Sequence, residues 1–119
     1  MKLICSYVVA ATLAFAQVSP DVDLKAAMHQ EQVLGDLNGA IAAYRKIAEK
    51  YPKNREIVAQ AMIHMAQCHE KLGEAQARGI YERVVREFGD QREQAAFASA
   101  RLAAKQSSAG VTSRKLFES

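Results

Sequence analysis

The chain is poor in the residues that mark disulfide-bonded, nucleic-acid-binding or membrane-spanning proteins. Its 119 residues include two cysteines, two prolines, no tryptophan and only 7% aromatic side chains. Cys5 lies in an apolar N-terminal segment, and loss of that segment would leave Cys68 without a partner for an internal disulfide. The net charge of +3 is spread along the chain without a block of basic residues, so no nucleic-acid partner is expected.

The apolar run at residues 3–16 is the longest in the chain, and it is shorter than the ~20 residues that a membrane-spanning helix needs. It follows the basic start Met1-Lys2 and ends at Ala14-Phe15-Ala16, a small-x-small pattern that signal peptidase accepts. We therefore predict a signal peptide at 1–16, and an exported bacterial protein that is periplasmic or secreted. After cleavage no membrane span is expected. The alternative is a retained N-terminal anchor.

From Asn54 onward the chain nearly repeats itself at an offset of 37 residues, the separation of Tyr44 and Tyr81. The positions that recur include a small residue, three large residues and a polar triplet. They are Ala40 and Ala77; Tyr44, Ile47 and Tyr51 with Tyr81, Val84 and Phe88; and Asn54-Arg55-Glu56 with Gln91-Arg92-Glu93. A period between about 20 and 50 residues is typical of stacked supersecondary units. It favours a binding scaffold over an enzyme.

Apolar residues at three- and four-residue spacing predict five helices, at 24–34, 37–51, 55–72, 74–88 and 91–105. Asn54 is the predicted N-cap of the third helix, and Pro52 ends the second. No segment alternates with a period of two, so no sheet is expected. The predicted organisation is a signal peptide at 1–16, a lead-in segment at 17–23 and a helical domain at 24–105. Residues 106–119 would be a linker, a disordered tail or the start of a missing domain, because 106–110 has linker composition.

The third predicted helix carries a buried seam of residues at helical spacing. The seam consists of Val58, Ala61, Met62, Met65, Ala66, His69 and Leu72. This assignment leaves Ile63 facing solvent.

The segment 35–47, followed by Tyr51-Pro52, resembles the second half of a tetratricopeptide repeat. A second, altered copy follows, with Met65-Ala66 and Leu72-Gly73 in its first helix, Tyr81 in its second, and a turn shorter by one residue. The resemblance covers roughly 24–104. The two copies are similar to the repeats of exported envelope proteins, such as the Tol–Pal coordinator and outer-membrane assembly lipoproteins. They are also similar to repeats placed ahead of β-propellers.

The resemblance implies an all-α fold, a right-handed α-α superhelix of about two and a half helix pairs. It also implies no catalytic activity, no cofactor, and a protein or peptide partner in the cell envelope. The unpaired ends of such a stack could self-associate. A second possibility is the N-terminal interaction module of a larger secreted protein.

In this family the first helix of each unit lines a concave groove, which gives a set of expected contact residues by position. They are Lys25, His29 and Gln32; then Gln60, Ile63, Gln67, Glu70 and Lys71; and finally Phe97 and Ala100. Ile63 and Phe97 are the most suggestive, because an exposed large apolar residue in a groove often marks a contact. Phe97 could instead pack under the C-terminal tail, and the charged members are equally compatible with a solvated helix face.

His64, Cys68 and His69 are the one cluster of metal-ligand residue types. His64 and Cys68 are four residues apart and would share a helix face, a workable spacing for two zinc ligands. A zinc site needs three or four ligands, and His69 points elsewhere on the helix. A small metal- or thiol-dependent protein is therefore the alternative from another functional class, and no metal site is predicted.

Overall fold

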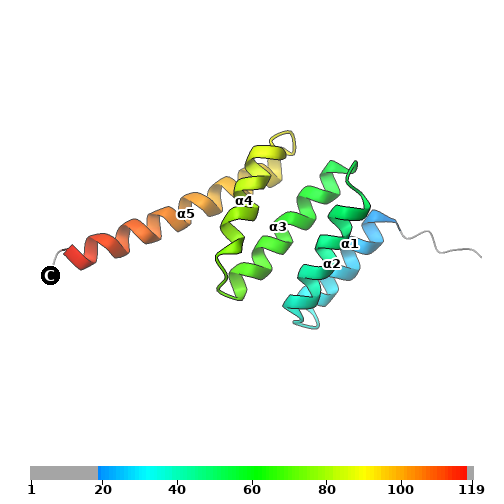
Figure 1. Cartoon of the computed structure of the whole chain (residues 1–119), viewed down its shortest axis with the longest axis horizontal. Coiled ribbons are helices and arrows are strands. Elements are labelled where there is room, and N and C mark those ends of the chain that lie inside the picture. Colours follow the sequence, from blue (N-terminus) through cyan, green and yellow to red (C-terminus); the bar gives the residue numbers. More distant parts are fainter. Residues whose placement is uncertain (1–18, 118–119) are drawn as a thin grey trace, which may run out of the picture.

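The computed structural model describes the backbone of residues 19–117 and the side chains of residues 19–105. Five helices follow one another along the chain: α1 (Pro20–Gln32), α2 (Leu37–Lys50), α3 (Arg55–Lys71), α4 (Gln76–Glu87) and α5 (Arg92–Phe117). Short turns join them into a stack of helix pairs, and the end of α5 projects beyond it (Figure 1). The described part of the chain has no strand. The predicted all-α fold is confirmed.

Side-chain caps begin three of the helices. The Asn54 side chain accepts a hydrogen bond from the Ile57 N–H at 3.2 Å, which confirms the predicted cap of α3. Asp36 caps α2 in the same way through the Gly39 N–H at 2.9 Å. These bonds satisfy backbone donors that have no partner within the first turn of a helix. The polar residues before each apolar run therefore fix where the helices begin.

A glycine follows the first helix of each of the two helix pairs, Gly35 after α1 and Gly73 after α3. Gly35 and Gly73 have φ angles of 67° and 71°, in the left-handed region that costs glycine little and other residues much more. The chain can therefore reverse within a few residues and lay the second helix against the first.

The outer ends of the helical domain differ from the predicted ones. Helix α1 begins at Pro20 instead of residue 24, because Ser19 caps it and proline suits the first helical turn. Helix α5 continues to Phe117, well past the predicted end at Lys105. Residues 106–117 contain no proline, and their one glycine, Gly110, lowers helix propensity without breaking the helix. The linker composition at 106–110 therefore does not end the helix.

The predicted signal peptide at 1–16 lies outside the described residues, and it stays a prediction. Within residues 19–117 no helix is long and apolar enough to cross a membrane.

Helix α3 is the centre of the stack, because it packs against α1, α2, α4 and α5. One face of α3 belongs to a core cluster with α1 and α2, and another to a cluster with α4 and Phe88. Ile63 is only 8% exposed, so the prediction that it faces solvent is wrong. Leu72, predicted to be buried, is the partly exposed C-cap of α3. A helix with neighbours on several sides buries more than one stripe.

The repeated positions carry the core of the stack. Ala40 and Ala77 are fully buried, as are Tyr44 and Tyr81. Small residues let adjacent helices approach to about 8–10 Å, and the tyrosines fill the space between one pair and the next. The 37-residue offset therefore marks equivalent packing sites.

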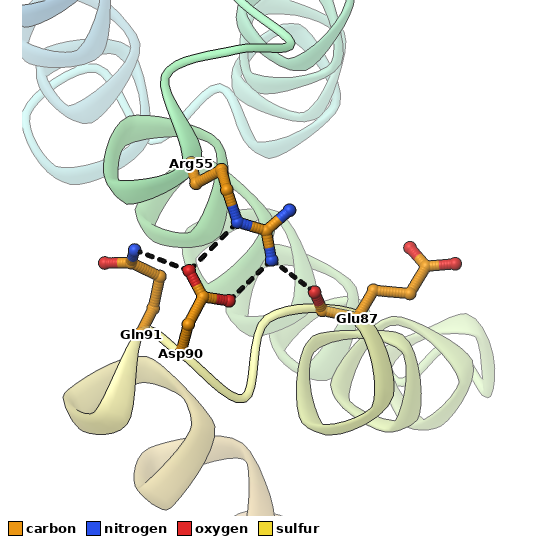
Figure 2. A network of polar contacts seen from close by, with 4 residues as sticks. All are labelled: Arg55, Glu87, Asp90 and Gln91. Atoms are coloured by element: carbon orange, nitrogen blue, oxygen red, sulfur yellow. Dashed lines mark hydrogen bonds and ion pairs between the residues drawn. The ribbon is translucent and has the colours of Figure 1, made fainter.

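Hydrogen bonds from Arg55 connect the start of α3 to the end of α4 and to the turn between α4 and α5 (Figure 2). The Arg55 Nε donates to Asp90 Oδ2 at 2.9 Å, and its Nη2 donates to Asp90 Oδ1 and to the Glu87 carbonyl oxygen, both at 2.5 Å. The guanidinium also lies 4.8 Å from the centroid of the Phe88 ring. The hydrogen bonds from Arg55 hold the pKa of Asp90 well below its usual range.

Candidate functional site

The first helices of the successive pairs, α1, α3 and α5, line two adjoining pockets that we call the groove. The His64 pocket, of about 340 Å³, is lined by Gln60, Ile63, His64, Glu93, Gln94 and Phe97. The Lys71 pocket, of about 350 Å³, is lined by Glu31, Gln32, Gln67, Glu70, Lys71, Phe97 and Arg101. Phe97 lines both, so its ring lies between them.

Most of the contact residues expected from the sequence lie in this groove. Gln60 and Ile63 line the His64 pocket, and Gln32, Gln67, Glu70 and Lys71 line the Lys71 pocket. Lys25 and His29 are exposed on α1 and line neither pocket. Ala100 is exposed on α5 and also lines neither. Helix α1 therefore contributes only its last turn to the groove.

Phe97 is the large apolar side chain that the groove exposes to solvent. It is 39% exposed, and its ring lies 6.3 Å from that of Tyr81 at an interplanar angle of 51°. This tilted arrangement is one that aromatic pairs prefer. Tyr81 thus supports one side of Phe97, and the rest of the ring stays available to a ligand.

Four residues that line the groove were missed by sequence reasoning: Glu31, Glu93, Gln94 and Arg101. Glu31 is the most deeply buried of them. Its side chain is 2% exposed, and it accepts hydrogen bonds from Tyr44 Oη at 2.5 Å and from Lys71 Nζ at 3.4 Å. His64 Nδ1 lies 3.2 Å from its Oε2, and the His64 ring stacks on Tyr44 with centroids 5.4 Å apart. These partners come from α2 and α3, so only the folded stack identifies Glu31 as a buried carboxylate under the groove.

Burial and the hydrogen bond to Glu31 both raise the pKa of Tyr44, so its hydroxyl stays protonated and remains a donor. The carboxylate of Glu31 is compensated by donors from two other helices, as buried charges require. At the floor of the groove, the buried Glu31 carboxylate therefore has hydrogen-bond or ion-pair partners on both α2 and α3.

Arg101 and Glu70 make a second ion pair in the Lys71 pocket. Arg101 Nε donates to Glu70 Oε1 at 3.2 Å, and its Nη2 donates to Glu70 Oε2. Burial is the largest single influence on the pKa of Glu70 and raises it, but Arg101, the Tyr81 hydroxyl and the Lys105 charge together outweigh burial, so the net pKa is lowered. Arg101 follows His64 by 37 residues, and each of the two contacts a carboxylate of the preceding unit.

Tyr81, which follows Tyr44 by 37 residues, differs from it in one respect. Its buried Oη has no hydrogen-bond partner among the described residues, whereas the Tyr44 hydroxyl is held by Glu31. Burial raises the pKa of Tyr81, and the nearby Glu70 carboxylate raises it further.

The arrangement of His64, Cys68 and His69 does not support a metal or thiol site. His64 faces Glu31, whereas His69 Nδ1 contacts Glu74. Burial, followed by the nearby Glu31 charge, raises the pKa of Cys68 to about 12, which disfavours the reactive thiolate. Within the part of the chain that the structure describes, no three His, Cys, Asp or Glu residues are placed to hold a metal ion.

A family model described as tetratricopeptide repeat matches residues 21–54 and 60–90, more than half of the chain. Comparison with curated proteins and with solved structures gives no significant match. The first matched segment covers α2 and all of α1 except Pro20, and the second covers most of α3 and all of α4. The helix pairs, the glycine turns and the 37-residue offset agree with this match. The chain belongs to the tetratricopeptide repeat family.

Proposed function

We propose that this chain is a non-catalytic scaffold that binds a protein or peptide segment in the groove between α1, α3 and α5, and that it does so in the bacterial cell envelope. The tetratricopeptide fold suggests protein partners. The envelope location is supported by the sequence of residues 1–16, which has the charge, length and terminal pattern of a signal peptide.

The observation that carries the proposal is the position of Phe97. An aromatic side chain between two pockets gives a ligand an apolar anchor, with polar groups on either side to set its register. The buried Glu31 network and the Arg101–Glu70 pair hold the walls in place. Preformed walls lower the entropic cost of binding.

The test is capture of a partner from envelope extract by immobilised chain, with Phe97→Asp compared against Val85→Asp. Val85 is a matched control, because it is 38% exposed and lines neither pocket. Phe97→Asp should abolish capture of an identified partner, whereas Val85→Asp should leave it unchanged. Equal capture by both variants, with both folded by circular dichroism, would mean that the groove is not the binding site.

Export is tested separately. Cell fractionation should find the chain outside the cytoplasm, with a new N-terminus at or near Gln17. A chain that keeps Met1 and stays in the cytoplasm would contradict the envelope location and leave the groove proposal standing.

A further inference from the structure

Three groove residues of α5 form an acidic, aromatic and basic stripe. Glu93, Phe97 and Arg101 are four residues apart, so they lie on one face of the helix at intervals of about 6 Å. Glu93 and Phe97 line the His64 pocket, and Phe97 and Arg101 line the Lys71 pocket. The stripe therefore runs along the groove, with a negative charge on one side of the Phe97 ring and a positive charge on the other.

The charges that a ligand meets differ between the two ends. Glu93 is exposed and has no ion pair among the described residues. At the other end the cations are outermost, since the Lys71 and Arg101 side chains are 54% and 44% exposed, whereas the Glu31 and Glu70 side chains are 2% and 15% exposed. The groove thus presents a carboxylate at one end and two cations at the other.

Compensation of helix dipoles accounts for only part of this pattern. Glu93 lies in the first turn of α5 and Lys71 in the last turn of α3, where such charges are favourable in any helix. Arg101 lies in the middle of α5, away from either end. The pair with Glu70 holds Arg101 at this place on the stripe and leaves its side chain 44% exposed, so it can also meet an acidic group of a ligand.

We infer that the groove binds an extended peptide segment with a basic, an apolar and an acidic side chain at alternate positions. In an extended chain side chains i, i+2 and i+4 point to one face at intervals of about 6.6 Å. That spacing matches the interval of about 6 Å along the stripe. The basic side chain would lie at Glu93, the apolar one on Phe97, and the acidic one at Arg101 and Lys71. This inference rests on the proposed function.

The glutamines of the groove favour an extended ligand over a helical one. Gln67 lines the Lys71 pocket, and Gln60 and Gln94 line the His64 pocket. Each amide group both donates and accepts, so it can pair with the backbone N–H and C=O groups that an extended segment exposes. A helix has already paired those groups internally.

Fluorescence anisotropy with four labelled peptides tests the charge pattern. The mixed peptide is Lys-Ser-Leu-Ser-Glu, measured also in reverse order because the glutamines do not fix chain direction, and the others carry Lys or Glu at both ends. Of the two orders of the mixed peptide, the one with the higher affinity should bind about two- to fivefold more tightly than either like-charge peptide. This is the difference expected when one exposed ion pair is gained. Equal affinities for all peptides would overturn the inference.

Glu93→Lys should reverse the preference, so that the peptide with two glutamates binds most tightly. Glu49→Lys makes the same charge change on an exposed residue of α2 outside both pockets, and it should leave the preference unchanged. An unchanged preference in Glu93→Lys would also overturn the inference.

Phe97→Asp separates the two proposals. If all peptides bind equally and Phe97→Asp abolishes binding, the groove binds peptides and the charge inference fails. If no peptide binds although Phe97 is needed to capture an identified partner, the inference again fails and the proposed function stands. If neither peptide binding nor capture depends on Phe97, both fail.

Discussion

Tyr44 donates a hydrogen bond from its hydroxyl to the buried carboxylate of Glu31 at 2.5 Å. The bond joins α2 to α1, and His64 and Lys71 bring α3 to the same carboxylate. One acidic side chain therefore connects the first helix pair to the next. Its removal should affect the relation between pairs as well as the pair to which it belongs.

Tyr44→Phe should destabilise the fold by about 1.5–3 kcal/mol, the range for a hydrogen bond to a charged group, because a buried carboxylate loses a donor. Tyr81→Phe is the matched control at the equivalent position. It removes a buried hydroxyl that lies near Glu70 but makes no hydrogen bond of normal geometry among the described residues, so its effect should be smaller than that of Tyr44→Phe. Urea unfolding followed by circular dichroism measures both. Equal destabilisation by the two changes would contradict the role of Glu31.

Arg55→Ala should lower the midpoint of urea unfolding, because it removes the bonds that hold the start of α3 to Asp90 and Glu87. Arg92→Ala is the control at the repeat-equivalent position. Arg92 is exposed and has no ion pair among the described residues, so its removal should leave the midpoint unchanged. Equal midpoints for the two variants would show that the contacts of Arg55 add nothing to stability.

The Asp90–Arg55 pair should also make stability depend on pH. The pKa of Asp90 is lowered in the folded state, so the pair contributes above the unfolded pKa of about 4 and is lost as pH falls through the lower folded pKa. Wild type should therefore be more stable than Asp90→Asn at pH 6, and the difference should shrink as pH falls below about 4. Urea unfolding at several pH values measures the difference, and a constant difference would contradict the assignment.

Cys68 should resist thiol reagents in the folded protein. It is fully buried, and its pKa is raised to about 12 by burial and by Glu31, so almost no accessible thiolate exists at pH 8. In a Cys5→Ser chain, labelling by iodoacetamide should be slow in buffer and rapid in denaturant. Fast labelling of the folded chain would contradict the burial of Cys68 and reopen the thiol alternative.

The existence of the five helices, the Asn54 cap and the repeat could be predicted, because they depend on short-range signals and on a regular spacing along the chain. Asn54 caps the helix that follows it, Gly73 ends the helix before it, and Tyr44 and Tyr81 recur at a fixed offset. Such signals come from local geometry and helical periodicity.

The burial of Ile63 and Glu31 could not be predicted in the same way. The apolar stripe of α3 predicted one buried face, but four neighbouring helices bury a second one that includes Ile63. Glu31 sits among charged and amide residues that predict a solvated surface, and its partners are 13 to 40 residues away. Contacts between helices from different units decide both positions.

The central place of α3 has a consequence for how the chain unfolds. Long repeat arrays can lose terminal units one at a time, because each unit contacts only its neighbours. Here α3 belongs to both core clusters, so neither cluster survives without it. Residues 20–105 should therefore unfold in a single cooperative transition, and a partner that engages α3 would stabilise the whole stack at once.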